Sequence, residues 1–284
     1  MIKNFVINIK AAENRRKHIV NMFDLNEKIA FELFEAVTPE NLDETIEIIM
    51  PSLKYNQQLS LGEKSCLMSH ASLWKKCVDE RIAYMAIFED DVVLGRRAHF
   101  FLKDSEWIES RFANDAVIIR LETFLTKSNL KKTKIPSKEN CQFFKLESIA
   151  LGSAAYIISY HAAEILLAEL RSVNNHEAYK VKSADWILFD NMLRRKDIAV
   201  HQVFPAVCIQ DQRLQVNNGL GSDMEFERSV YHKANQHLLK RKTLKEFIEY
   251  HIIKLPLRKY RKLRRKKVPF DNGWNTRLFA FGCN

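Results

Sequence analysis

Glycine and proline are scarce in this 284-residue sequence, which contains seven and six of them respectively. Collagen-like and linker-rich chains need much more of both, and no internal repeat or low-complexity tract is visible, so these classes are excluded. Hydrophobic residues make up 46% of the chain, which is enough to bury one large core or two modest ones. The composition therefore indicates a globular protein.

The five cysteines are widely spaced, and no two of them form a Cys-x-x-Cys pair. This argues against a disulfide framework and against a zinc cluster. No apolar run approaches the roughly 20 residues that a membrane-spanning helix needs. The N-terminus also lacks the apolar core and the cleavage site of a signal peptide. We therefore expect a protein of the reducing cytoplasm.

Positive charge is present in excess, but it is concentrated near the C-terminus. The formal net charge is +10, and residues 240–267 alone contain 13 of the 45 Lys and Arg residues and only two Glu. The rest of the chain is therefore close to neutral. Nucleic acid is not expected as a partner, because no recognition motif accompanies the charge.

The basic tail itself has an amphipathic pattern. Apolar residues recur at helical spacing between Leu244 and Leu255, and Pro256 separates them from the cationic run 258–267. Such a helix can lie on an anionic membrane, where each cation contributes on the order of 1 kcal/mol. The alternative is a solvated tail. We expect a catalytic domain at 1–230 and a basic amphipathic appendage at 231–284.

Short apolar runs alternate with helical segments along the first 210 residues. This order predicts an α/β fold, a mostly parallel sheet with helices on both faces. Strands are expected at 5–9, 31–37, 84–88, 116–121, 151–159 and 198–209, and helices at 13–26, 41–50, 61–80, 100–112, 161–170 and 183–195.

Ligands of such folds collect beyond the carboxyl ends of the strands, so polar residues that follow an apolar run are candidates by position. Three groups follow apolar runs in this way: Asn8 with Arg15 and Arg16, the triplet Glu89-Asp90-Asp91, and Arg120 with Glu122. Three adjacent carboxylates repel one another unless a cation or several donors neutralise them. The triplet therefore indicates a site for Mg²⁺ or Mn²⁺, although a surface turn is the competing interpretation.

Two further candidates have strong structural alternatives. Glu63 and His70 share a face of the predicted helix 61–80 with the aromatic Trp74, and that spacing alone favours a role in packing. Asp185 lies in the first turn of a predicted helix, where a negative charge is stabilising in any case. It could also act as a general base, but spacing does not select it over Asp190 or Asp211.

Six segments together have the order and spacing of a known family. They are Asn8 with Arg15-Arg16, Gly62-Glu63 to Ser69-His70, Phe88 to Val92, Arg120-Leu121-Glu122, Gly152 with Ala155 to Ser159, and Pro205 to Cys208. Over roughly residues 1–230 the chain resembles family 25 glycosyltransferases, and within them the bacterial lipooligosaccharide β-1,4-galactosyltransferases. The resemblance implies a GT-A-like, Rossmann-like fold and an inverting transfer from a UDP-sugar, UDP-galactose in the first place, to a saccharide acceptor.

The resemblance also implies roles for residues. It places Glu89, Asp90 and Asp91 at a divalent metal and makes Asp185 the base. It implies substrate-binding roles for Asn8, Arg15, Arg16, Glu63, His70, Arg120 and Glu122. Among these, Arg15 and Arg16 suit contacts with the diphosphate or the uridine. The usual Asp-x-Asp element reads Glu-Asp-Asp here, which leaves the metal ligands open. A third ligand is also open among His201, Asp211 and His232.

We therefore expect a glycosyltransferase of lipooligosaccharide biosynthesis on the inner face of the bacterial inner membrane. One alternative is a metal-dependent nucleotide-sugar hydrolase or phosphotransferase, because acids and arginines serve those reactions too. Another is a non-catalytic binding protein associated with a membrane or with nucleic acid.

Overall fold

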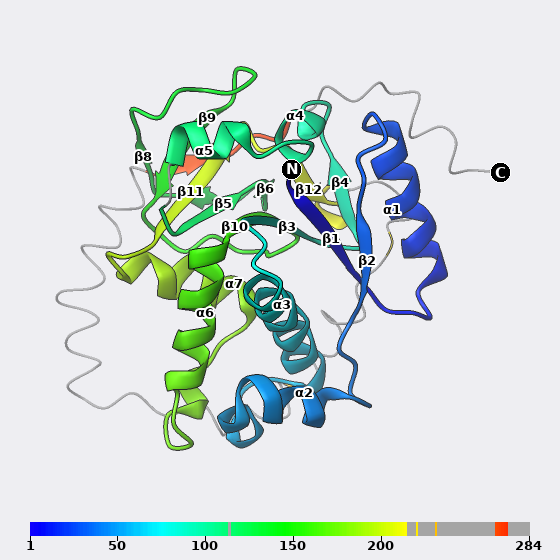
Figure 1. Ribbon diagram of the computed structural model, residues 1–284, viewed down its shortest axis with the longest axis vertical. Helices are drawn as coiled ribbons and strands as arrows, with labels where there is room; N and C mark the ends of the chain where they lie inside the picture. Colours follow the sequence, from blue (N-terminus) through cyan, green and yellow to red (C-terminus); the bar gives the residue numbers. More distant parts are fainter. Residues whose placement is uncertain (113–114, 215–219, 221–230, 232–264, 272–284) are drawn as a thin grey trace.

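A central sheet of eight strands organises the molecule (Figure 1). The computed structural model describes residues 1–112, 115–214, 220, 231 and 265–271. The sheet has the order β2-β1-β3-β10-β5-β11-β9-β8. Its strands in chain order are β1 (Lys3–Asn8), β2 (Glu32–Glu35), β3 (Tyr84–Glu89), β5 (Val117–Arg120), β8 (Leu130–Lys132), β9 (Gln142–Leu146), β10 (Ala155–Ser159) and β11 (Ala199–Phe204).

Most strands of this sheet run in one direction. Strand β1 is parallel to β2 and β3, and β5 is parallel to β11. Strand β10 is antiparallel to both β3 and β5, so these two strands share a direction. Strand β9 is antiparallel to both β11 and β8. The expected mostly parallel, Rossmann-like sheet is confirmed, with β9 and β10 as its reversed members.

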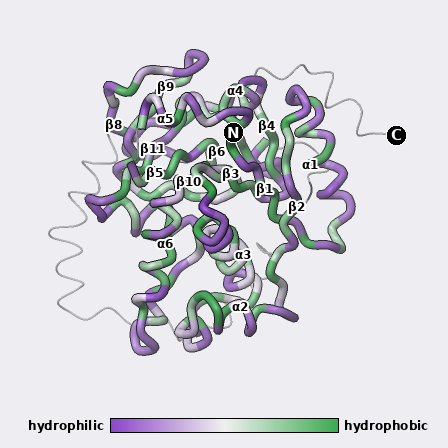
Figure 2. Tube along the Cα trace, viewed as in Figure 1, coloured by the Kyte–Doolittle hydropathy of each residue, from purple (hydrophilic) through white to green (hydrophobic). Residues whose placement is uncertain are grey.

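Helices cover both faces of the sheet, as expected. One face packs against α2 (Leu42–Ile49), α3 (Leu61–Asp79) and α6 (Tyr160–Ser172), and the other against α1 (Glu13–Leu25), α4 (Ala98–Leu102) and α5 (Glu106–Phe112) (Figure 1). Successive side chains of a strand point to opposite faces, so β3 serves both cores: Met85 and Ile87 belong to one, and Ala86 and Phe88 to the other. Figure 2 shows apolar strands between helices of mixed polarity.

Four predicted elements are wrong in detail. The strand expected at 151–159 begins only at Ala155, because residues 151–154 form a loop. The helix at 100–112 is two helices, α4 and α5, and Ser105 starts the second by bonding to Glu109. The helix at 183–195 is helical only as α7 (Ala184–Trp186) before a π-helical turn (Ile187–Asn191) and a 3-10 turn (Met192–Arg194). Phe189 interrupts it because its backbone is not helical.

The extended run 198–209 is also two elements. Strand β11 ends at Phe204, and Pro205, which has no N–H to continue a ladder, follows a cis peptide bond. The chain then joins a three-stranded sheet as β12 (Cys208–Gln210), between β4 (Val92–Leu94) and β6 (Glu122–Thr123). This small sheet brings the segments after β3, β5 and β11 side by side.

Part of the predicted appendage belongs to the folded body. Strand β13 (Lys266–Lys267) pairs with β7 (Lys127–Ser128). Val268 and Phe270 are buried, and Asp271 forms an ion pair with Arg97 at 3.2 Å. The predicted amphipathic helix between Leu244 and Leu255, most of the cationic run and His232 lie outside the described residues.

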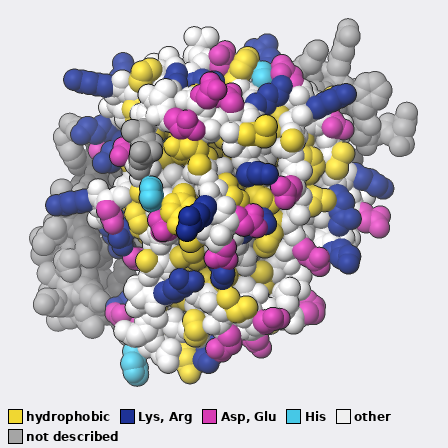
Figure 3. Space-filling view, in the orientation of Figure 1, with side chains coloured by type: hydrophobic (Ala, Val, Ile, Leu, Met, Phe, Trp, Pro, Cys, Tyr) yellow, Lys and Arg dark blue, Asp and Glu magenta, His cyan; other side chains and the backbone are white. Residues whose placement is uncertain are grey.

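The described body has a mixed surface. Figure 3 shows Lys and Arg side chains interspersed with Asp and Glu on the face that it draws, as the near-neutral charge of this part of the sequence implies. Within the described part of the chain, none of the helices combines the length and apolar character needed to cross a bilayer.

Candidate active site

The candidate residues meet at one edge of the main sheet. Asn8, Glu89 and Arg120 are the last residues of the strands β1, β3 and β5, which share a direction. Because β10 runs the opposite way, the loop 151–154 that precedes it arrives at the same edge. The tertiary structure thus brings together the three polar groups that the sequence places after apolar runs.

Asp90 is fully matched by polar partners. It accepts hydrogen bonds from Asn8 Nδ2 at 2.7 Å and from Arg15 Nη1 at 2.6 Å. Asn8 Oδ1 in turn accepts two bonds from Arg16 at 3.3 Å, and Arg16 also donates to the carbonyl of Lys10 at 2.8 Å. We call Asn8, Arg15, Arg16 and Asp90 the matched group, because each of its polar side chains has a partner of opposite character.

Glu89 is held by three donors from different elements. Its Oε1 lies 3.3 Å from His70 Nε2 and accepts a bond from Ser153 Oγ at 2.7 Å, and its Oε2 accepts one from Gln210 Nε2 at 3.4 Å. Burial by itself would raise the pKa of Glu89, but the hydrogen bond and charge of His70, with Ser153 and Arg15, together lower it. Glu89 is therefore an ionised carboxylate at neutral pH.

Asp91 is buried with much less compensation. Only 6% of it is exposed, its Oδ2 accepts one long bond from Gln210 at 3.4 Å, and no donor among the described residues reaches its Oδ1. Burial and, next, the charge of Glu89 raise the pKa of Asp91 to about 7. A buried carboxylate in this state favours a proton or a cation.

Glu122 has the same deficit. Its Oε1 accepts the Ala154 N–H at 2.9 Å and lies 3.7 Å from Arg120, but its Oε2 has no donor among the described residues. Burial, which outweighs the attraction of Arg120, raises the pKa of Glu122 to about 8. Gln210 Oε1 is the third buried oxygen of this region that no donor among the described residues reaches. We call Asp91, Glu122 and Gln210 the open group.

Arg120 is a buried anchor. It donates to the Glu122 carbonyl at 2.8 Å, to Gln202 Oε1 at 2.9 Å and to the Leu151 carbonyl, and its guanidinium lies 5.3 Å from the ring centroid of Phe189. Burial lowers the pKa of Arg120, although Glu122 and then Asp185 act in the opposite direction. Arg120 therefore ties the strand end to the loop 151–154.

The loop 151–154 connects four of the candidates. Its contacts are Leu151 carbonyl with Arg120, Gly152 N–H with Asp185 Oδ2 at 3.2 Å, Ser153 Oγ with Glu89, and Ala154 N–H with Glu122. Gly152 has φ of +90°, and a Cβ there would lie 2.9 and 3.0 Å from the carboxylate oxygens of Glu122. Only glycine suits both this backbone and this close approach.

Asp185 is half-buried and oriented by its neighbours. Besides Gly152, its carboxylate accepts the Ser183 hydroxyl at 2.5 Å and the Trp186 N–H at 3.0 Å. The structure thus places Asp185 beside the loop 151–154. Asp190 forms an ion pair with Arg194, and Asp211 accepts the Leu220 N–H at 2.9 Å.

Glu63 and His70 have visible structural roles. Glu63 completes a capping box at the start of α3: its Oε2 accepts the Ser60 N–H at 3.0 Å, and its own N–H donates to Ser60 Oγ at 3.2 Å. His70 is fully buried, and its Nδ1 lies 2.9 Å from the Tyr156 hydroxyl, which also accepts Trp74 Nε1 at 2.9 Å. His70 therefore reaches the site through Glu89, and the sugar-binding role of Glu63 stays a prediction.

His201, a candidate third ligand, lies inside β11 with its ring 5.0 Å from that of Phe112. Burial lowers the pKa of His201 to about 4, so it is a neutral, core-facing imidazole. Asp211 is better placed, because its N–H donates to the Asp91 carbonyl at 2.9 Å.

Sequence reasoning missed Ser153 and Gln210. Both donate to carboxylates of the triplet, yet neither belongs to a charged motif. Gln210 ends a buried strand, which is the one signal that could have identified it.

The open group suits a hard divalent cation. Its three donorless atoms are buried oxygens, the ligand type that Mg²⁺ and Mn²⁺ prefer, and two of them belong to carboxylates whose pKa values burial raises. A cation beside Asp91 and the ionised Glu89 would supply the missing positive partner, and Glu122 and Gln210 interact with these same two carboxylates, so the residues present fit a divalent metal.

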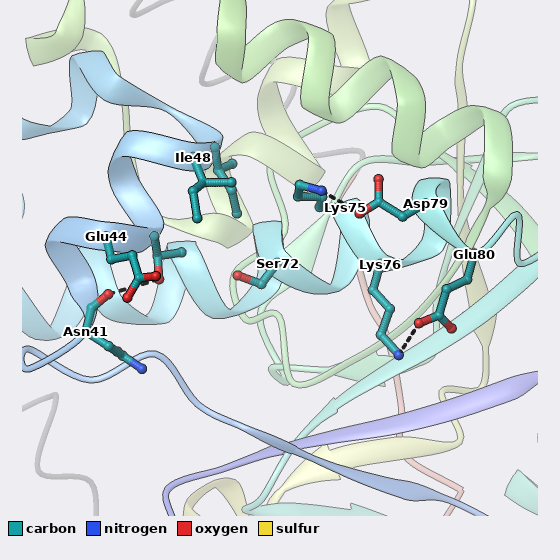
Figure 4. A pocket seen from close by; sticks show the side chains of 10 residues that line it. Asn41, Glu44, Ile48, Ser72, Lys75, Lys76, Asp79 and Glu80 are labelled. Carbon is teal, nitrogen blue, oxygen red and sulfur yellow. Dashed lines mark hydrogen bonds and ion pairs between the residues drawn. The ribbon is translucent and has the colours of Figure 1, made fainter.

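A separate groove of about 510 Å³ lies between α2 and α3 (Figure 4). Figure 4 shows Lys75 paired with Asp79 and Lys76 with Glu80 along its wall. These lysines are already neutralised, and none of the candidate site residues lines the groove. It therefore offers no arrangement for chemistry.

Known proteins resemble this chain over most of its length. Residues 1–185 match the profile of the family described as Glycosyltransferase family 25 (LPS biosynthesis protein). The chain is 39% identical over 233 residues to the lacto-N-neotetraose biosynthesis glycosyltransferase LgtE of Neisseria meningitidis serogroup B, which covers 80% of this chain and 82% of that protein. It is 36% identical over 271 residues to the lipooligosaccharide biosynthesis protein lex-1 of Haemophilus influenzae, which covers 86% and 87%.

Proposed function

Because the chain belongs to glycosyltransferase family 25, we propose that it transfers a hexose, galactose in the first place, from a UDP-sugar to a saccharide acceptor of lipooligosaccharide. The observation that carries the proposal is the open group beside Glu89 at the carboxyl edge of the sheet. Unmatched buried oxygens next to an ionised carboxylate suit a cation and, through it, a diphosphate. The names of the two relatives support the saccharide acceptor.

The donor end of the site is assigned to the acids and the two arginines. Asp91 and Glu89 would hold Mn²⁺ or Mg²⁺. Asp90, the third acid of the triplet, would contribute by fixing the position of Arg15. The bound ion would stabilise the negative charge that develops on the departing UDP. Arg15 and Arg16, fixed by Asp90 and Asn8, add positive charge on the same side.

The acceptor end is assigned to Asp185. Its carboxylate is half-buried and held by three donors, so it is positioned but still reachable. It would take the proton of the acceptor hydroxyl while that oxygen attacks the anomeric carbon and the bond to UDP breaks on the opposite side. Such a displacement inverts the anomeric configuration. Glu63, His70 and Glu122 stay proposed contacts of the sugar hydroxyls, and Arg120 stays a proposed substrate-binding residue.

We place the protein on the cytoplasmic face of the inner membrane, held there by the basic tail. The support is the sequence pattern of residues 240–267. This location would put the site beside a lipid-linked acceptor and a cytoplasmic pool of UDP-sugar. The tail contributes to delivery, whereas the chemistry belongs to the edge of the sheet.

The test is a screen of UDP-galactose, UDP-glucose and their N-acetylated forms against lactose-type and N-acetylglucosamine acceptors, with and without Mn²⁺. We expect UDP release that is matched one-to-one by glycosylated acceptor and that requires the metal. UDP release without acceptor product would instead identify a hydrolase. Failure to bind or turn over any UDP-hexose would overturn the proposal.

A further inference from the structure

A thiol, an imidazole and a carboxylate converge on the wall of the active site. Cys66 and His70 lie one helical turn apart on α3, and Glu89 ends β3. One ligand atom from each, the cysteine sulfur, a ring nitrogen and a carboxylate oxygen, lies within 4.8 Å of the other two. This set differs from the acidic triplet because it includes sulfur and nitrogen.

The separations are close to those of a tetrahedral zinc site. With Zn–S of about 2.3 Å and Zn–N of about 2.0 Å, two ligand atoms of one tetrahedron lie roughly 3.3–3.7 Å apart. The pair His70 Nε2 and Glu89 Oε1 is already at 3.3 Å. The sulfur of Cys66 lies within 4.8 Å of the other two ligand atoms, so a shift of no more than about 1–1.5 Å, which rotation of side chains could supply, would complete the tetrahedral spacing.

Both inner ligands already have the supporting contacts that metal ligands need. The Tyr156 hydroxyl lies 2.9 Å from His70 Nδ1 and accepts Trp74 Nε1, a pure donor. Without a metal, His70 Nε2–H donates to Glu89, and the Tyr156 hydroxyl can donate to Nδ1. When a metal takes the place of the Nε2 proton, Nδ1–H donates to the same hydroxyl and Nε2 presents its lone pair to the metal. Ser153 orients the Glu89 carboxylate in the same way.

The site is also reachable. His70 is fully buried, but Cys66 is half-buried and the Glu89 side chain is 18% exposed. A cation can therefore enter from the side of Cys66 and keep one position for water. Thiolate and imidazole ligands select zinc-like ions over Mg²⁺ and Mn²⁺, which prefer oxygen.

We propose that Cys66, His70 and Glu89 form a second cation site, specific for Zn²⁺ and similar borderline ions. Its consequence for activity rests on the proposed function: Glu89 is shared with the donor-site metal, so Zn²⁺ at the second site withdraws it and inhibits transfer. The site has no motif in the sequence, because Cys66 belongs to no cysteine pair and the third ligand, Glu89, comes from a strand 19 positions after His70.

Cobalt tests the binding directly. Metal-free, full-length protein is titrated with Co²⁺, and we expect a thiolate-to-cobalt charge-transfer band that saturates at one equivalent and that Zn²⁺ displaces. Cys66→Ser should lose the band, and because it removes a direct ligand it should weaken Zn²⁺ binding by at least the roughly 10–100-fold that is typical of losing a supporting contact. Cys77→Ser is the matched control, because that buried thiol donates to the Ile82 carbonyl and a hydroxyl can replace it. Absence of the band, or its persistence in Cys66→Ser, would overturn the site.

Two further measurements guard against misfolding and against failure of the proposed function. In the wild-type protein, Zn²⁺ should slow alkylation of Cys66, located by peptide mass mapping, and equal alkylation with and without Zn²⁺ would contradict the site. Neither this readout nor the cobalt band uses a sugar donor. In the transfer assay with Mn²⁺, Zn²⁺ should inhibit the wild type and inhibit Cys66→Ser at least about tenfold less. Equal inhibition of both would refute the regulatory role.

Discussion

The matched group and the open group lie at the same edge of the sheet and differ in how their charges are satisfied. Asp90 and Asp91 are adjacent, and each is 6% exposed. Asp90 accepts strong bonds from Asn8 and Arg15. Within the described part of the chain, Asp91 has one long bond from Gln210 and one oxygen that no donor reaches. Equal burial therefore has opposite consequences for two neighbouring carboxylates.

This difference separates residues that complete the fold from residues that await a ligand. A buried carboxylate without partners costs several kcal/mol, and proteins retain such groups where a cation or a substrate compensates them. The matched group is complete in the protein alone. The open group is not, so changes there should affect activity more than stability.

The largest expected effect is that of Asp91→Asn. The amide keeps the shape of the side chain but loses the charge that a cation needs, so we expect hexose transfer to fall roughly 10²–10³-fold. Unfolding of the metal-free variant should occur at the same temperature as the wild type or higher, because an uncompensated charge has gone. Transfer rates and thermal unfolding measure the two effects. A loss of less than tenfold would mean that Asp91 is not at the metal.

The next effect is on the pH dependence of stability without metal. The pKa of Asp91 is about 7 in the folded protein against 3.8 as its ordinary value. Because the folded protein holds the Asp91 proton more tightly than the unfolded chain does, protonated Asp91 stabilises the fold fully below pH 3.8. This stabilisation, at most on the order of 4 kcal/mol, is lost as the pH rises through 7. Denaturant unfolding with a chelator should therefore give lower stability at pH 8 than at pH 5. Glu122, whose pKa burial raises to about 8, lowers stability in the same direction over this range, so Asp91→Asn should make the dependence shallower and leave the part that is due to Glu122. An unchanged slope would show that Asp91 does not contribute to it.

Gly152→Ala should disturb the open group through sterics. The new methyl group would meet Glu122 and Phe124 at 2.9 Å on a backbone that disfavours alanine. We expect a loss of about 1–3 kcal/mol in the free energy of unfolding and at least about a tenfold loss of activity. Leu151→Ala, in the same loop but 38% exposed, is the control and should stay within about 0.5 kcal/mol. Similar behaviour of both variants would show that the close approach at 152 is unimportant.

Asp90→Asn should have the smallest effect on activity. It removes the charge opposite Arg15 but leaves one oxygen for Asn8, so we expect a loss of about 1–2 kcal/mol in stability. Transfer should fall by about tenfold, through the position of Arg15, and not through the metal. A loss as large as that of Asp91→Asn would erase the distinction between the two groups.

Much of the fold follows from local pattern. The apolar runs before Glu89 and Arg120 predict β3 and β5, because strands buried on both faces must be apolar throughout. The single strand expected at 198–209 is wrong, because the extended chain belongs to the main sheet before Pro205 and to the three-stranded sheet after it. Strands β7 and β8 went unpredicted, since short strands such as Lys127–Ser128 have no apolar run to mark them. Strand β9 was also missed, although it lies between β11 and β8 and buries Phe143 and Phe144, because its apolar run is only two residues long.

The site was predictable in its charged members. Acids and arginines at strand ends stand out in a sequence because burying charge needs a reason. Ser153 and Gln210 did not stand out, and their importance comes only from the carboxylates that they contact. The proximity of Cys66 to Glu89 could not be predicted for the same reason, since it depends on a tertiary contact and not on a sequence motif.

By itself, the sequence determined the α/β class, the strand ends that carry polar groups, and the family. These depend on the spacing of apolar residues and on short motifs, which are local. Only the tertiary structure decided that Asp90 is matched while Asp91 and Glu122 are open, and that α3 presents Cys66 and His70 to Glu89. Those contacts depend on the strand order of the sheet, which places residues far apart in the chain within hydrogen-bonding distance.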